Sequence, residues 1–177
     1  ALSLAATGLV ALAAALALRG DGGAAGAGSP MPALPIDGPA LYKVEYLGIT
    51  CGHMVLSSEL ASRAGRPAYH IVMTARNSKF FNKIYRVDGR IESWVDAATL
   101  STLSYESDIT EKGERKVRRY RIDGERGVLV AEKDGQVNET PYRDGGLDPL
   151  AFIFRGRLLA GYPGTSFEQR LLTDKGA

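Results

Sequence analysis

The sequence predicts a mainly β domain: an antiparallel meander forming a curved sheet or incomplete barrel, with one helix near the C-terminal end. Three observations predict this fold. From residue 41 onward, apolar residues recur with a period of two, which is typical of half-buried strands. Short turn signals rich in Asp and Gly separate the apolar runs. Only one stretch, around residues 147–161, has the spacing of an amphipathic helix.

Length and composition are those of one globular domain with a tail. The chain has 177 residues, of which 45% are hydrophobic and 24% charged, and this balance excludes global disorder and a coiled coil. The single cysteine excludes an internal disulfide and a multi-cysteine zinc site. A net charge of +2 gives no argument for nucleic acid, and we expect no nucleic-acid partner.

The first 27 residues are typical of a targeting segment. Residues 1–18 are apolar and rich in Ala and Leu, and Ala25-Gly26-Ala27 has the small-residue form of a cleavage site. An uncleaved N-terminal anchor is the alternative, because the run reaches the lower limit of a membrane span. Either interpretation places the protein in the periplasm or outer envelope. Residues 28–40, rich in Gly, Ala and Pro, form a linker, and the β-rich domain occupies 41–177.

Strands are expected wherever apolar and polar residues alternate. The clearest alternating runs lie around 42–46, 69–74, 91–96 and 128–131. Trp94 is an exception, since it puts an aromatic on the polar side of its strand. Turns are predicted at Gly52, 64–67, Asp88-Gly89, Lys112-Gly113, Asp123-Gly124 and Asp134-Gly135.

The predicted helix covers about 148–160. Asp148 is its N-cap, Pro149 its first residue and Gly161 its C-terminal cap. Leu150, Ile153 and Phe154 form the apolar stripe that faces the sheet. Residues 165–177 look like a further strand that runs into a turn, so we expect the domain to be truncated at its C-terminus.

No residue pattern in the sequence favours a catalytic or metal-binding site. Cys51 and His53 share a strand face, and with His70 they would suit nucleophilic chemistry or a metal, but this spacing is nonspecific. The alternative is a structural role, in which Cys51 is a small buried residue. No nucleophile elbow, phosphate-binding loop or calcium loop occurs. We therefore expect no enzyme activity, no cofactor and no metal.

A basic run is the most pronounced local feature. Alternation places Arg115, Arg119 and Arg121 on one face and Arg118 on the other. The run could be an anion-facing strand that binds a lipid headgroup, a phosphate-bearing polymer or an acidic partner. The alternative is an edge strand that its charges protect from aggregation.

Aromatic residues of the strand region are the candidates for an apolar ligand site. They could line a cavity inside a curved sheet, or they could be plain core. The candidate ligand-binding residues are Tyr42, Tyr46, Tyr69, Tyr85 and Trp94.

Four segments together resemble domain of unknown function 3108, a family of exported bacterial proteins. The segments are YKVEYLGITCGHMVLSS, FFNKIYRVDGRIESWVDAATLSTLSYE, GERKVRRYRID and GGLDPLAFIFRGRLLAGYPG. In the last of these, Asp148, Arg155, Leu158 and Gly161 stand at the expected places. The resemblance covers about residues 41–172. It implies a signal or anchor, no established activity and further strands beyond residue 177.

The expected function is non-enzymatic. Export, a concave sheet, aromatic strands and a basic strand favour an envelope protein that binds an apolar or amphipathic ligand such as lipid or an envelope polymer. The alternative is a structural or assembly module that contacts an envelope protein through a sheet edge or the basic strand.

Overall fold

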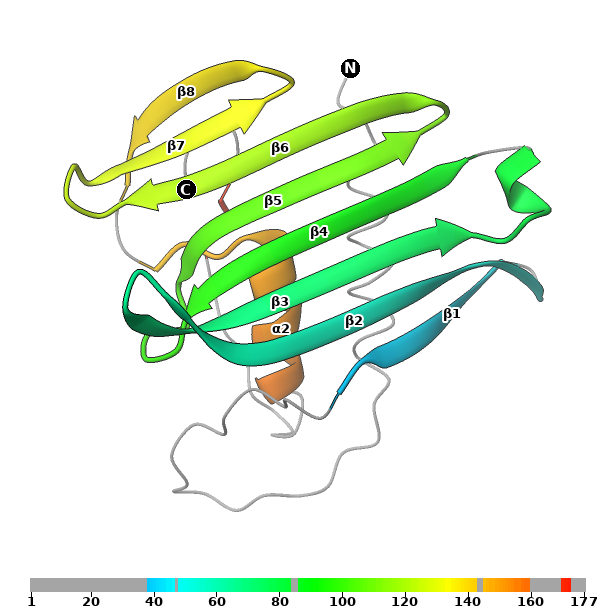
Figure 1. Ribbon diagram of the computed structural model, residues 1–177, viewed down its shortest axis with the longest axis horizontal. Helices are drawn as coiled ribbons and strands as arrows, with labels where there is room; N and C mark the ends of the chain where they lie inside the picture. Colours follow the sequence, from blue (N-terminus) through cyan, green and yellow to red (C-terminus); the bar gives the residue numbers. More distant parts are fainter. Residues whose placement is uncertain (1–37, 47, 84–85, 143–144, 160–169, 173–177) are drawn as a thin grey trace.

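The protein is one open, curved antiparallel sheet of eight strands with a helix across one face (Figure 1). The computed structural model describes residues 38–46, 48–83, 86–142, 145–159 and 170–172. Strand order along the sheet is the order of the chain, β1 to β8, so every neighbouring pair is a meander connection. The predicted fold class is therefore confirmed.

The strands range from six to fifteen residues. The two longest are β2, which lies beside the edge strand β1, and β3, which follows it in the sheet, and β8 forms the other edge. The elements are β1 (Ala40–Tyr46), β2 (Ile49–Arg63), β3 (Arg66–Asn77), the short 3-10 helix η1 (Phe81–Lys83), β4 (Val87–Asp96), β5 (Thr102–Glu111), β6 (Glu114–Asp123), β7 (Val128–Lys133), β8 (Gln136–Pro141) and α2 (Pro149–Leu159).

Three tight hairpins have the backbone that the turn signals predict. Both central residues of each have positive φ, as type I′ turns require. These pairs are Ala64-Gly65, Lys112-Gly113 and Asp134-Gly135. The turn after Asp123 is also present, but it is a four-residue loop over 124–127.

Two predicted turns are wrong. Gly52 lies inside β2, where it pairs with Asn77, and Asp88-Gly89 lies inside β4 opposite Thr110 and Ile109. At Gly52 a Cβ would stand 2.4 Å from the backbone oxygen of Arg76, so glycine permits close strand pairing there.

Alternation sorts the strand residues onto two faces. Ile71, Met73, Ile91 and Val95 are buried on the face covered by α2, and they form its core with buried residues of the helix. Helix residues Leu150, Ile153 and Phe154 are buried as predicted. Among the described residues, no helix is long and apolar enough to cross a membrane.

The helix begins as predicted, after the N-cap Asp148, whose Oδ1 accepts hydrogen bonds from the N–H groups of Leu150 and Ala151. Gly161 lies outside the described residues. Of the predicted C-terminal strand, the described part shows a parallel bridge between Leu147 and Leu171.

Candidate functional site

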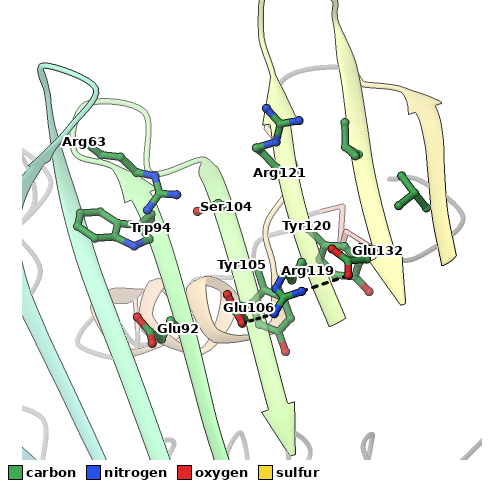
Figure 2. Close-up of a pocket in the computed structure, with 12 residues that line it drawn as sticks. Arg63, Glu92, Trp94, Ser104, Tyr105, Glu106, Arg119, Tyr120, Arg121 and Glu132 are labelled. Atoms are coloured by element: carbon green, nitrogen blue, oxygen red, sulfur yellow. Dashed lines mark hydrogen bonds and ion pairs between the residues drawn. The ribbon is translucent and has the colours of Figure 1, made fainter. Parts of the chain in front are cut away.

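The face of the sheet turned away from α2, here called the open face, carries polar side chains and a hollow (Figure 2). One register row crosses five strands of this face, from Glu59 through His70, Trp94 and Ser104 to Arg121. On β3 to β6 the row reaches the open face because each of its residues stands next to a buried residue of its strand. Glu59 shares this face because it pairs with His70.

The open-face hollow has a volume of about 310 Å³. It runs across the sheet from β2 to β8. Its lining residues are Arg63, Glu92, Trp94, Ser104, Tyr105, Glu106, Arg119, Tyr120, Arg121, Val130, Glu132 and Val137.

The first part of the site is centred on Trp94, because two planar groups stack on its ring. The His70 ring lies 4.2 Å from it, centroid to centroid, at 13°, and the Arg63 guanidinium carbon lies 4.7 Å from the ring centroid. Figure 2 shows the Arg63 guanidinium on the side of Trp94 that faces Ser104. An arginine over an indole face is a favourable cation–π contact. Burial lowers the pKa of Arg63, and Glu92 opposes this effect.

His70 is held between two carboxylates. Its Nδ1 lies 3.2 Å from Glu59 and its Nε2 lies 2.9 Å from Glu92. Glu92 also accepts a hydrogen bond from Arg90, and this bond is the main cause of its lowered pKa. Hydrogen bonds of His70 to Glu59 and Glu92 thus fix one side of the stack of Arg63, Trp94 and His70.

Positive charge is unevenly neutralised in the hollow. Arg119 lies 3.1 Å from both Glu106 and Glu132, and these contacts raise its pKa (Figure 2). Arg121, two residues along β6, is exposed and forms no ion pair or hydrogen bond within the described residues; the carboxylate that senses its charge, Glu139, is already paired with Arg126. The end of the hollow near Arg121 and Arg63 is therefore its cationic end.

The five candidate aromatic residues do not line one cavity. Tyr69 is buried in the core, and Tyr42 packs against the core from β1. Trp94 lies on the opposite face, in the hollow. Tyr46 ends β1, and Tyr85 lies outside the described residues. Among the candidates whose side chains the structure describes, only Trp94 lies at the hollow.

The four candidate arginines are likewise divided, as alternation predicts. Arg115 donates to Asp108 at 2.8 Å, and Arg119 and Arg121 line the hollow. Arg118 points to the other face, in register with buried Ser107. Strand β6 lies between β5 and β7, so the alternative interpretation of the basic run as an edge strand is wrong.

Cys51, His53 and His70 do not converge. The rows of His53 and His70 are six residues apart along β2, a separation of roughly 20 Å. The Cys51 thiol lies 3.4 Å from the carbonyl oxygen of Ile49. Within the part of the chain that the structure describes, no three metal-ligating side chains form a cluster.

Of the twelve residues that line the hollow, sequence reasoning proposed only Trp94, Arg119 and Arg121 as site residues. It missed the other nine, among them Arg63, Ser104 and the two valines. The available signal was Trp94, whose place on the polar side of β4 marked that face as unusual. Finding its partners also requires the register of the strands, which brings Arg63 to Trp94 across 31 positions of sequence.

Comparison with known proteins gives a family but no activity. A family model described as "Protein of unknown function (DUF3108)" matches residues 41–176. Neither the curated proteins nor the solved structures contain a significant match.

Proposed function

The chain belongs to the DUF3108 family of proteins of unknown function, and we propose that it is a non-catalytic envelope protein that binds an anionic amphipathic ligand in the open-face hollow. The observation that carries the proposal is the pairing of two cations, Arg63 and Arg121, with the apolar side chains of Trp94, Val130 and Val137 in one hollow.

The two halves of such a ligand match two parts of the hollow. Val137 is 60% exposed on β8 and, with Val130 of β7, offers an apolar surface to a hydrocarbon chain. Arg63 and Arg121 flank Ser104, so an anionic head there gains two cations and a hydroxyl donor. At the other end Arg119 is already paired with glutamates, which disfavours an anion.

The core face supports a ligand less well than the open face does. The side chains of its core cluster on β2 to β7 are at most 7% exposed, so a ligand among them would have to displace packed core; Leu60, near the end of β2, is exposed but lies outside this cluster. Catalysis has little support either, because the described lining of the hollow has a serine but no histidine or cysteine, and His70 lies under Trp94 with its ring nitrogens turned to Glu59 and Glu92.

Location in the envelope is the second part of the proposal. Residues 1–27 support it through their apolar run and the Ala25-Gly26-Ala27 site, as a cleaved signal or as an anchor. N-terminal sequencing of the protein recovered from envelope fractions tests it, with Gly28 as the expected first residue after cleavage. Recovery of the protein in the cytosol contradicts it.

The ligand test uses Trp94, which is the only tryptophan of the chain. We expect monododecyl phosphate, titrated below its micelle concentration, to change the Trp94 fluorescence saturably. Arg121→Gln should weaken binding at least about tenfold, because a charge-assisted hydrogen bond contributes about 1.5–3 kcal/mol. Dodecyl maltoside, which has the same chain and no charge, should bind more weakly.

Lys43→Gln is the matched control. Lys43 is an exposed cation on the open face of β1, outside the hollow. Its replacement should leave the affinity unchanged. Equal weakening by Arg121→Gln and Lys43→Gln would show that only net charge matters and would reject the hollow as the site.

An assembly module remains the second candidate, and the edge strand β8 favours it. Five of its six residues are exposed, and one side of the strand pairs with β7 while the other has no strand partner among the described residues. A partner could add a strand there. If so, Asn138→Lys should abolish the recovery of a specific envelope protein and leave the Trp94 titration unchanged.

A further inference from the structure

One end of the sheet gathers exposed apolar and cationic side chains. The connection from β3 to β4 lies there, beside the turn from β1 to β2 (Figure 1). We call the described residues Ser78–Lys83 and Arg86 the η1 loop. The loop is tied to β2 by the N–H of Ser78, which donates to the Cys51 oxygen at 2.7 Å.

Phe80 is the apolar centre of this end. It is 64% exposed, although burying a phenylalanine side chain is worth about 1.5–3 kcal/mol. Phe81 packs edge-to-face against it at 5.5 Å and 83°, and the N–H of Lys83 donates to the Phe80 oxygen at 3.2 Å. The neighbouring turn adds Ile49, which is 55% exposed. These contacts of the described loop residues thus hold Phe80 outward.

Cations surround Phe80. Lys79, Lys83 and Arg86 are exposed and form no ion pair within the described residues, and no acidic residue occurs between Arg76 and Val87 in the sequence. The N–H of Lys112 donates to the Arg86 oxygen at 3.0 Å, which brings the hairpin from β5 to β6 alongside the loop.

The acidic groups nearest in the fold offset this charge only in part. Asp88 is paired with Arg76 at 3.7 Å, and Glu111 is buried and paired with Lys116. Glu114 is exposed in the Lys112 hairpin. The surface around Phe80 is therefore cationic.

We propose that the η1 loop docks this end of the sheet on an anionic lipid bilayer. An exposed aromatic side chain flanked by lysine and arginine suits the bilayer interface, where the ring enters the headgroup region and the cations meet lipid phosphates. Charge complementarity selects an anionic membrane surface as the partner. The surface is separate from the open-face hollow, and docking does not depend on the ligand proposed above.

The test places an environment-sensitive fluorophore on the loop of the full chain. In a Cys51→Ser background, NBD is attached at Asn82→Cys, and at Ser62→Cys near the opposite end of the sheet as the control. With vesicles of phosphatidylcholine and phosphatidylglycerol, the Asn82 label should brighten several-fold and be quenched by brominated lipid. The Ser62 label should not change. Because the test compares two label positions on the same chain, membrane binding through an N-terminal anchor would not by itself produce the expected difference between them.

Two variants separate the contribution of the lysines from that of the Phe80 ring. K79E/K83E should weaken the response by at least 25-fold on these vesicles, because each cation near an anionic surface contributes about fivefold. Phe80→Ser should weaken it about tenfold. All positions are exposed, and unchanged thermal unfolding confirms that the variants fold.

Three results would overturn the proposal. The first is no response of the Asn82 label to anionic vesicles, and the second is an equal response of both labels. The third is a response that survives K79E/K83E. If Arg121→Gln abolished the response while K79E/K83E did not, lipid would be engaging the hollow and the η1 loop would have no docking role.

Discussion

At the scale of the residue, Asp148 joins the helix to the sheet. Its carboxylate is fully buried and accepts hydrogen bonds from Ser93 at 2.6 Å and Thr102 at 2.7 Å, besides two N–H groups of α2. Burial raises its pKa, and these hydrogen bonds oppose the rise. The sequence predicts the N-cap, since Asp before Pro is local, but the two hydroxyl partners lie 55 and 46 positions away.

The raised pKa predicts how stability depends on pH. Above the ordinary value of 3.8 the unfolded chain loses the Asp148 proton first, so the folded state binds more protons and stability falls as the pH rises. Asp148→Asn keeps the shape of the side chain but cannot titrate, so the variant should lack this pH-dependent contribution to stability. The difference in unfolding free energy between wild type and Asp148→Asn, measured in denaturant, should therefore shrink from pH 3.5 upward. An unchanged difference would contradict the prediction.

Removing the carboxylate altogether should be more damaging. Asp148→Ala deletes the cap and leaves the Ser93 and Thr102 hydroxyls buried without this acceptor, so we expect a loss of about 2–4 kcal/mol. Urea unfolding followed by circular dichroism measures it. Asp96→Ala is the control, since Asp96 caps an exposed turn at Ala98 and Thr99, and should lose less.

At the scale of the element, the glycines show which turns can be predicted from the sequence and which cannot. Asp134-Gly135 and Asp88-Gly89 have the same local pattern, yet the first is a type I′ turn and the second lies within β4. The difference lies in the partner strand: Gly89 pairs with Ile109, whose Cγ1 would stand 3.1 Å from an added Cβ. Whether an Asp-Gly pair forms a turn or lies in a strand therefore depends on long-range strand pairing, which cannot be read from a single sequence.

Gly52 gives a prediction at this scale. In Gly52→Ala the methyl group would meet only backbone, at 2.4 Å from the Arg76 oxygen and 3.0 Å from the Asn77 Cα, so β2 and β3 must shift apart. We expect a loss of stability of about 2–3 kcal/mol. Gly124→Ala, with no atom within 4 Å, should change it by less than about 0.5 kcal/mol. Equal thermal stability of the two variants would contradict the account.

At the scale of the whole molecule, the fold class follows from the sequence but the site does not. Hairpins between consecutive strands are local, so a meander and its helix can be inferred from turns and periodicity. The hollow combines side chains of six strands, and among the candidate aromatics with described side chains only Trp94 reaches it. That β6 lies inside the sheet also depends on the register of β7, which no local pattern specifies.

The central claim is that the hollow holds an anionic amphiphile, and native mass spectrometry tests it most directly. The full chain is purified from an envelope fraction beside the double variant R63Q/R121Q, which removes both cations of the hollow. The account predicts wild type with an added mass that fragments to an anionic amphiphile, and the variant without it. A bare wild-type mass, or the same added mass on both proteins, would contradict the account.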